Sequence, residues 1–307
     1  MNFLKKFLIF NKIIKYNRSE FKEKKYKGNT GIVLLEFNSF HILHIIFAYI
    51  SNYFVKKNKY KIEAFYSHLL LSYKIKRSLF QIIKTFFGKL LNLGFFGVYK
   101  SFGTSNFIFP KINKLITLNA KREYFKIIKK ITSKDQILNI KIKNIQVGDL
   151  IYDSYLTRNK KQKPTIDIND EDFKIFLYEF MLLFYFWYFY FKENKIKVVI
   201  SSHSCYTMGI PCRLAMKNII CCLEVKENRL KRLSFKNYHH YSDTVNYPKK
   251  FKSLKKNIKI NALAIAKKNI SKRFKGINVD IPFAQKSAFK NIKIREKKRK
   301  NKKFTIL

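Results

Sequence analysis

The feature that most constrains the fold is the order of elements between residues 195 and 223. An apolar run at Lys197–Ser201 (KVVIS) predicts a buried strand, and Ser202–Ser204 predict a polar turn after it. A helix is expected near Tyr206–Lys217 and a second strand at Ile219–Leu223. A strand, a helix and a strand within about thirty residues are typical of a right-handed crossover between parallel strands.

The segment before this unit, Ile175–Phe191 (IFLYEFMLLFYFWYFYF), is strongly apolar. Its length is at the lower limit for a membrane span, but it contains Glu179. Tyr and Phe dominate it, and these residues prefer membrane interfaces to the bilayer centre. Four carboxylates before it favour a helix N-terminus: Asp167, Asp170, Glu171 and Asp172. We therefore expect a helix that is buried against a sheet rather than a transmembrane span.

A second unit of the same kind lies near the N-terminus. Ile32–Glu36 (IVLLE) and Tyr60–Tyr66 (YKIEAFY) predict strands, and Ser39–Val55 predicts the helix between them. The fold class is therefore expected to be α/β, with a doubly wound, Rossmann-like parallel sheet and helices on both faces. Further expected elements are a helix around Ser78–Leu93, a loop through Gly94, Gly97 and Gly103, a helix at Ile112–Ile131, a strand within Ile137–Val147 and a helix at Leu254–Phe274.

The chain of 307 residues is strongly basic, with 65 Lys and Arg against 19 Asp and Glu and a formal net charge of +46. A hydrophobic fraction of 47% and an aromatic fraction of 17% exclude an intrinsically disordered chain. The chain is rich in Lys, Ile, Phe, Asn and Tyr, which have A- and T-rich codons, so its amino-acid composition is typical of an AT-rich genome. That bias does not explain the shortage of carboxylates, and the charge favours anionic partners such as phosphates and acidic lipids. No zinc-finger, RRM or basic-zipper signature indicates a specific nucleic-acid partner.

The first residues, Met1–Tyr16 (MNFLKKFLIFNKIIKY), place apolar side chains at helical spacing with lysines between them. They lack the uninterrupted apolar stretch and the cleavage site of a secretory signal. Two interpretations stay open. The helix either lies on an anionic membrane surface or packs its apolar stripe on the domain itself.

The cysteines do not have the paired C-x-x-C spacing of a zinc site. Cys221 and Cys222 are neighbours in an expected strand and should point to opposite faces of the sheet. We interpret all four as small buried hydrophobes in a reducing compartment: Cys205, Cys212, Cys221 and Cys222. The chain also contains no P-loop, no G-x-G-x-x-G fingerprint and no G-x-S-x-G elbow, so ATPase, dinucleotide and serine-hydrolase chemistry have no motif support.

Ligands of a doubly wound sheet bind outside the carboxyl ends of its strands, and three candidate segments have this position. In the first, Glu36 ends an expected strand and Ser39 is placed to cap the next helix. Glu36 is a candidate general base for an acceptor hydroxyl, and His41 a candidate acceptor-binding residue. His41 and His44 have helical spacing but no third ligand for a metal. Capping and packing alone are the alternative.

The second segment is Gly148–Leu156 (GDLIYDSYL). Asp149 and Asp153 lie four residues apart and, with Tyr152, form a compact polar set in an otherwise apolar chain. Carboxylates and aromatic faces commonly bind sugar hydroxyls, so these three are candidate acceptor-binding residues. A turn stabilised by Asp149 is the alternative.

The third segment is Ser201–Tyr206 (SSHSCY), followed by Arg213. Small hydroxyl residues leave room for a ligand, and the next helix would present N–H groups to an anion. Ser204 and Arg213 are therefore candidate phosphate-binding residues. His203 is the candidate for an acid–base or phosphate-contacting group, and a buried histidine bonded to the backbone is the alternative.

Two of these segments resemble a known family. Gly148–Leu156, with the later Ser202-His203, Tyr206, Gly209 and Arg213-Leu214-Ala215, is similar to bacterial surface-carbohydrate or capsular-polysaccharide biosynthesis proteins. These proteins look like two-domain glycosyltransferases of the GT-B kind. The likeness extends over Gly31–Leu307, with only these two segments specific, and Thr157 displaces the arginine expected after Leu156.

The resemblance implies two Rossmann-like domains that face each other across a cleft. The N-terminal domain mainly holds the acceptor, and the C-terminal domain holds the nucleotide-sugar donor. The expected division is a basic amphipathic segment at 1–28, an acceptor-side domain at 29–285, and a basic linker with the first strand of a truncated second domain at 286–307. The donor site would then be missing, and the chain inactive alone. Such enzymes generally use basic groups and helix dipoles, so neither a metal nor a cofactor is expected.

The expected function is therefore transfer of a sugar from a nucleotide sugar to a polysaccharide or lipid-linked acceptor. The reaction would serve capsule or surface-polysaccharide assembly on the cytoplasmic side of the inner membrane, with peripheral contact to anionic lipid left open. Two rivals remain. One is a sugar-nucleotide epimerase of similar architecture, and the other is a basic scaffold that binds a membrane surface or nucleic acid.

Overall fold

The computed structural model describes residues 3–21, 31–38, 41–66, 87–158, 165–226, 229–239 and 246–277. The chain divides into two compact units, Met1–Ser242 and Asp243–Leu307. The second unit contains α10 (Tyr247–Ser253) and α11 (Lys256–Phe274), in which no residue is buried. The helix predicted at Leu254–Phe274 is therefore confirmed. The predicted division at 286 and the predicted C-terminal strand lie outside the described residues.

The first unit is built on a six-stranded sheet with the order β3-β2-β1-β6-β7-β8. Every pair is parallel except β7 with β8, which is antiparallel and forms one edge of the sheet. From β1 the sheet continues through β2 to β3 on one side, and from β6 it continues through β7 to β8 on the other. The β1–β6 pair is thus the topological switch point of a Rossmann-like sheet. The strands are β1 (Ile32–Glu36), β2 (Lys61–Phe65), β3 (Thr104–Ile108), β6 (Ile196–Ser201), β7 (Cys221–Lys226) and β8 (Arg229–Arg232).

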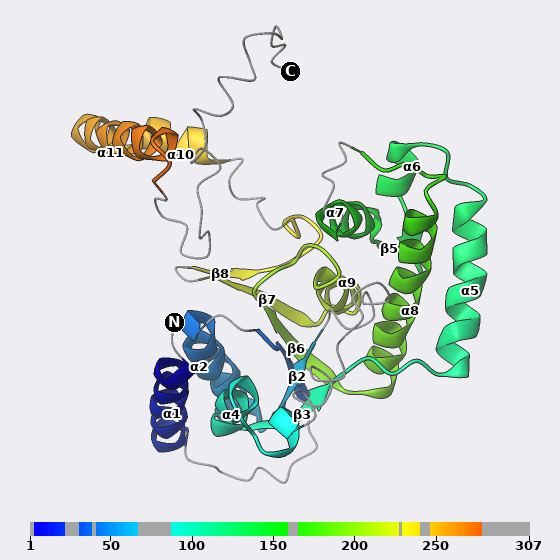
Figure 1. The fold of residues 1–307 in the computed structure, drawn as a ribbon, viewed down its shortest axis with the longest axis horizontal. Helices are drawn as coiled ribbons and strands as arrows, with labels where there is room; N and C mark the ends of the chain where they lie inside the picture. The colour runs from blue at the N-terminus through cyan, green and yellow to red at the C-terminus, as the bar shows by residue number, and fades with distance from the viewer. Residues whose placement is uncertain are drawn as a thin grey trace, which may run out of the picture. The chain divides into compact units, whose positions relative to one another are not determined.

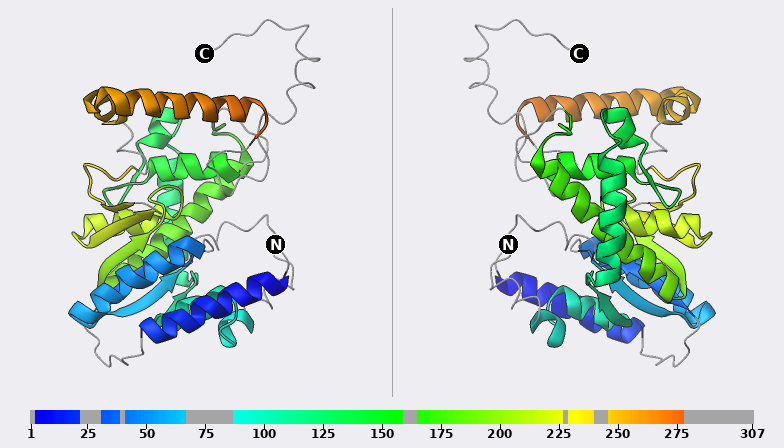
Figure 2. Two further views of the ribbon diagram at one scale, coloured as in Figure 1. Left: turned by 90° about the vertical axis from the view of Figure 1, so that its left-hand side faces the viewer. Right: turned by 90° about the vertical axis from the view of Figure 1, so that its right-hand side faces the viewer.

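Helices cover both faces of this sheet, as Figures 1 and 2 show. One face carries α1 (Phe3–Glu20), α2 (His41–Asn58) and α4 (Phe95–Ser101), and the other carries α5 (Lys114–Ile128), α7 (Gly148–Arg158), α8 (Glu171–Glu193) and α9 (Gly209–Lys217). Side chains of β1 alternate between the two cores, with Val33 under α2 and Leu34 on the α8 side. A strand buried on both faces reads as a continuous apolar run, as IVLLE does. The predicted α/β fold class is confirmed.

The aromatic helix α8 is the centre of one core. Asp170 caps it by accepting a 3.0 Å hydrogen bond from the backbone N–H of Asp172. Trp187 has no exposed surface, and its ring centre lies 5.3 Å from that of Phe65 on β2. The helix is therefore buried against the sheet, as predicted. Among the described residues, no helix has the length and apolar character needed to cross a membrane.

The N-terminal helix α1 packs on α4. The rings of Phe10 and Phe95 meet edge to face at 4.9 Å, and Asn17 donates a 3.0 Å hydrogen bond to the hydroxyl of Ser101. Gly97 permits this approach, because a Cβ there would lie 3.1 Å from Cδ1 of Ile14. Phe10, Ile13 and Ile14 of α1 thus pack within the unit, in line with the second interpretation, whereas Leu8 and Ile9 are exposed. Contact with a membrane stays a prediction.

Two stretches differ from the sequence-based expectation. Gly97 lies inside α4 rather than in a loop, and β3 follows α4 directly. The strand predicted within Ile137–Val147 is confirmed only in part: α6 (Lys134–Leu138) covers its start, and two short strands, β4 (Lys141–Ile142) and β5 (Ile145–Gln146), follow as a small hairpin outside the main sheet. Lys143 and Asn144 join these strands with φ angles of 51° and 60°, as in a type I′ turn. Of the helix predicted at Ser78–Leu93, residues 87–90 are helical and 78–86 lie outside the described part.

Candidate functional site

A cluster of polar side chains lies at the switch point, where β1 and β6 end side by side. Leu35 pairs with Ile200 in the parallel register, so Glu36 and Ser201 are the last residues of adjacent strands. The residues that follow complete what we call the switch-point cluster: Glu36, Asn38, Ser201, Ser202 and His203. Parallel strands that diverge here leave the position at which ligands of doubly wound sheets bind.

Glu36 is the centre of this cluster and is only 3% exposed. Its Oε2 accepts hydrogen bonds of 2.6 Å from the hydroxyl of Ser201 and 2.6 Å from the backbone N–H of Ser202. Its Oε1 accepts from the Ser202 hydroxyl at 2.8 Å and from the Asn38 amide at 2.9 Å. No cation among the described residues pairs with it. Four neutral donors therefore compensate the desolvation of this buried carboxyl group.

The hydroxyl of Ser202 connects Glu36 to His203. It lies 2.7 Å from His203 Nδ1 and also accepts a 2.9 Å hydrogen bond from the Asn38 amide. A hydroxyl has one proton, and the carboxylate is its strongest acceptor here, so it donates to Glu36 and accepts from His203 Nδ1–H. The neutral imidazole then carries its proton on Nδ1 and its lone pair on Nε2. This tautomer, on a half-buried side chain, is suited to accept a proton.

Side chains of α2 and α4 form hydrogen bonds to the backbone of the turn after β1. The hydroxyl of Tyr99 donates to the backbone oxygen of Glu36 at 2.7 Å and accepts from the backbone N–H of Asn38 at 2.9 Å. Burial raises the pKa of Tyr99 well above its ordinary value, so the hydroxyl keeps its proton. His44 Nε2 lies 2.6 Å from the backbone oxygen of Asn38. The side chain of the predicted acceptor residue His41 is outside the described part of the structure.

A second buried carboxylate, Glu224 of β7, holds the turn after β6. Its Oε1 accepts from the backbone N–H of Ser204 at 3.3 Å and from the Ser204 hydroxyl at 3.1 Å. Ser204, the predicted phosphate contact, thus bonds to a carboxylate inside the protein. Burial raises the pKa of the next residue, Cys205, to about 12, and the charge of Glu224 adds to this shift. Sequence reasoning missed Glu224, although a carboxylate within the apolar run CCLEVK was a signal for it.

Arg213, the other predicted phosphate contact, is a residue of α9 whose side chain is buried, with 1% exposed. Its Nη2 forms an ion pair of 2.5 Å with Oδ2 of Asp149, and its Nη1 donates to the backbone oxygen of Gln146 at 3.4 Å. The ring centre of Tyr238 is 3.8 Å from the guanidinium carbon. The guanidinium is therefore engaged by groups of the protein, and a role in phosphate binding stays a prediction.

The segment that contains the predicted acceptor residues is a helix, α7, and not a turn. It lies beside the residues that follow β6, because a Cβ on Gly209 would meet Leu150 of α7 at 2.8 Å and the backbone oxygen of Ser204 at 2.5 Å. Asp153 is the exposed member of the polar set. Partial burial raises its pKa, and the negative charge of Asp149 adds to that shift. Tyr152 is buried and lies under the ammonium group of Lys134, 5.2 Å from its ring centre.

Cys221 and Cys222 lie where strand alternation places them. Cys222 is buried on the α8 side, while Cys221 packs on the α2 side, so their predicted divergence is confirmed. All four are free thiols, and the prediction that they are buried holds for Cys212 and Cys222, whereas Cys205 and Cys221 are only partly buried. Within the ranges that the structure describes, no three His, Cys, Asp or Glu side chains are grouped so as to hold a metal ion.

The sequence and fold were compared with those of known proteins. No family model, no curated protein and no solved structure matches this chain.

Proposed function

We propose that this chain forms the acceptor side of a glycosyltransferase that acts in the assembly of a surface polysaccharide. The observation that carries the proposal is the hydrogen-bonded series from Glu36 through Ser202 to His203 at the switch point. The resemblance of GDLIYDSYL and of the Ser202–Ala215 motif to surface-carbohydrate biosynthesis proteins supports the same function. In such a protein the nucleotide-sugar donor would be held by a second domain.

His203 would act as the general base. An acceptor hydroxyl gives its proton to His203 Nε2, and its oxygen forms a bond to the anomeric carbon of the donor sugar. The bond from that carbon to the phosphate oxygen breaks, and a nucleoside diphosphate leaves with the electron pair. The developing imidazolium is stabilised through Ser202 by the negative charge of Glu36. Glu36 is a positioning residue in this scheme, because it is buried and acts through Ser202.

Asp153 and Asp149 would bind hydroxyls of the acceptor. Asp153 is exposed and is the better placed of the two, because Asp149 is paired with Arg213 and its Oδ1, although without a hydrogen-bond partner among the described residues, is a buried atom. Both side chains lie on α7 beside the turn after β6. Carboxylates accept hydrogen bonds from sugar hydroxyls, so this placement suits recognition of an acceptor near His203.

Transfer needs the donor domain, so it is tested on a full-length homologue, with His203→Ala and Ser202→Ala made at the equivalent positions, by incubation with nucleotide sugars and short glycan acceptors and identification of products by mass spectrometry. His203→Ala should lower kcat by about 10²-fold or more, the usual contribution of a general base. Added imidazole should restore part of the rate, which a merely structural role would not allow. A Ser202→Ala variant, which interrupts the link to Glu36, should shift the acid limb of the pH profile. Unchanged transfer in His203→Ala would contradict the proposal.

Acceptor binding is tested separately, because it needs no donor. Saturation-transfer NMR with glycan fragments should show contacts that Asp153→Asn weakens. Ser105→Ala on β3 is the control, since this residue lies on the sheet edge and bonds to Ile62. Conversion of a free nucleotide sugar without any acceptor would instead indicate the epimerase. If no glycan binds and no product forms, both the glycosyltransferase and the epimerase are contradicted.

A further inference from the structure

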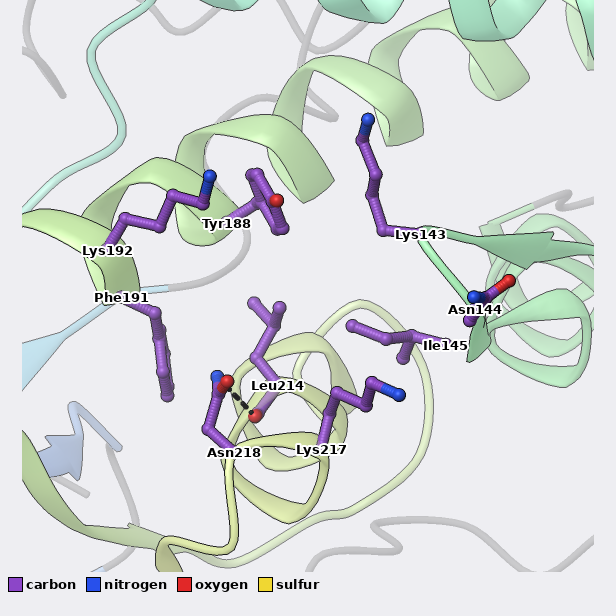
Figure 3. A pocket seen from close by; sticks show the side chains of 9 residues that line it. All are labelled: Lys143, Asn144, Ile145, Tyr188, Phe191, Lys192, Leu214, Lys217 and Asn218. Carbon is purple, nitrogen blue, oxygen red and sulfur yellow. Dashed lines mark hydrogen bonds between the residues drawn. The ribbon is translucent and has the colours of Figure 1, made fainter.

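A groove opens at the other ends of the same strands (Figure 3). It lies where α8 and α9 finish, next to the starts of β6 and β7, and has a volume of about 470 Å³. The switch-point cluster lies at the carboxyl ends of β1 and β6, so the two sites are separate. The groove is lined by Tyr188, Phe191 and Lys192 of α8, by Leu214, Lys217 and Asn218 at the end of α9, and by Lys143, Asn144 and Ile145 of the β4–β5 hairpin.

The charged residues that line the groove are all cationic. Lys143, Lys192 and Lys217 come from three different elements, and all three are exposed. No carboxylate lines the groove, and none of the three ammonium groups forms an ion pair with a described residue. Three cations that line one groove without a carboxylate give it a positive potential, which favours an anionic ligand.

The rest of the lining is aromatic and apolar. The rings of Tyr188 and Phe191 are partly exposed, while Leu214 and Ile145 are buried at 1% and 2% and form the floor. Figure 3 shows Tyr188, Leu214 and Ile145 directed into the space between the three elements. The Tyr188 ring already carries one cation, since the ammonium group of Lys192 lies 4.9 Å from its centre. The groove thus offers cations beside a surface on which a ring or an apolar group can pack.

Helix electrostatics explain only part of this arrangement. Lys192 and Lys217 lie in the last turns of α8 and α9, where a cation is favourable beside the helix C-terminus. The position of Lys143 is not explained by a helix C-terminus, because this residue lies in the turn between β4 and β5. It lies in a type I′ turn with a φ of 51°, a position that favours Asn, Asp and Gly. Its side chain adds a third cation to the lining of the groove.

We propose that this groove binds a phosphorylated organic anion. The phosphate would lie between the three lysines, and the ring or apolar part of the ligand would pack on Tyr188 and Phe191. The ligand is either a free nucleotide or a phospholipid headgroup with its first methylenes, and the shared chemistry is the phosphate. This site does not depend on the proposed glycosyltransferase activity.

The test is calorimetric titration of the full chain with uridine diphosphate, adenosine diphosphate and inorganic pyrophosphate, and co-sedimentation with phosphatidylcholine vesicles that contain or lack phosphatidylglycerol. Lys143→Gln, Lys192→Gln and Lys217→Gln should each weaken binding about tenfold, the usual effect of one charge-assisted hydrogen bond. The triple variant should abolish it. These side chains are exposed, so the variants should keep the wild-type melting temperature.

Lys57→Gln is the matched control. Lys57 follows Tyr53 by four residues, lies 5.6 Å from its ring centre and belongs to the last turn of α2, as Lys192 follows Tyr188 in α8. Lys57 lies on the opposite face of the sheet. The Lys57→Gln variant should therefore bind every probe as the wild type does. Nucleotide binding stronger than pyrophosphate binding identifies a nucleotide, and sedimentation only with phosphatidylglycerol, lost in the triple variant, identifies a lipid headgroup. No binding of any probe, or equal weakening by Lys57→Gln, would overturn the proposal.

Discussion

The backbone N–H of Ser202 donates a 2.6 Å hydrogen bond to Oε2 of Glu36 across the switch point of the sheet. This bond ties the turn after β6 to the end of β1, two segments that are 166 residues apart in sequence. Because Glu36 receives three further donors, the cluster is organised before any ligand arrives. The conformation of the turn, and with it the position of His203, depends on the charge state and shape of one carboxyl group.

Glu36→Gln should therefore destabilise the protein. The amide places an N–H₂ group where only donors converge, so at least one buried donor loses its acceptor. We expect the free energy of unfolding to fall by about 1–3 kcal/mol, measured by denaturant titration. Glu171→Gln is the control: it removes an exposed carboxylate that pairs with Lys174, and the free energy of unfolding should fall by less than about 1 kcal/mol. Equal stability of Glu36→Gln and the wild type would show that the four hydrogen bonds do not form.

Asp149→Ala should also lower stability, because it leaves the buried guanidinium of Arg213 without its ionic partner. Breaking a fully buried pair costs about 3–5 kcal/mol. Asp149 is 23% exposed, so solvent screening reduces the expected loss to about 2–3 kcal/mol. The Asp149→Ala, Arg213→Met double variant should recover much of it in urea titrations. A double variant that is less stable than Asp149→Ala would contradict this account.

The thiol of Cys205 should react slowly in the folded protein. Its pKa is raised to about 12, so at pH 8 its thiolate fraction is about 10³-fold below that of an unfolded cysteine. Higher thiolate nucleophilicity offsets part of this difference, and alkylation by iodoacetamide should still be at least about tenfold slower. Mass spectrometry of the native protein and of the protein in guanidinium chloride measures the ratio. Rapid labelling of native Cys205 would refute the raised pKa.

Asp153→Asn should stabilise the protein at neutral pH. Burial and Asp149 raise the folded-state pKa of Asp153, so folding disfavours its charged form. This cost is fully present above the folded pKa and disappears as the pH falls below the unfolded value of about 3.9. The difference in urea midpoint between variant and wild type should therefore be positive at pH 7 and vanish near pH 3. A variant that is less stable at pH 7 would mean that Asp153 has a favourable charge partner.

The sequence predicts the elements that bury an apolar run. The strand predicted at Ile32–Glu36 matches β1 to the residue, and the helix before β6 is confirmed because its aromatic residues form a core. The sequence does not predict β3 (TSNFI) or β8 (RLKR), which lack an apolar run because they are edge strands. Tertiary pairing, not local preference, makes them strands.

For the candidate site, the sequence predicts its position in the sheet but not which residues form hydrogen bonds and ion pairs there. Glu36 and His203 follow expected strands, and the rule for doubly wound sheets brings them to one edge. The sequence does not predict the role of Tyr99, because this residue lies in a helix within a glycine-containing stretch whose pattern favours a loop. The ion pair of Arg213 with Asp149 joins residues 64 apart and leaves no trace in local spacing. Long-range contacts of this kind decide which polar groups remain available to a ligand.

The edge strand β8 has a consequence for self-association. In the sheet that the structure describes, β8 pairs with β7 on one side only, and an exposed edge strand invites edge-to-edge pairing with another molecule. Three of its four residues are cationic, namely Arg229, Lys231 and Arg232. A second copy that docked here would bring six positive side chains into one narrow seam. We therefore expect the molecule to resist fibril-like polymerisation through this edge at low ionic strength and to lose that protection as salt screens the charges.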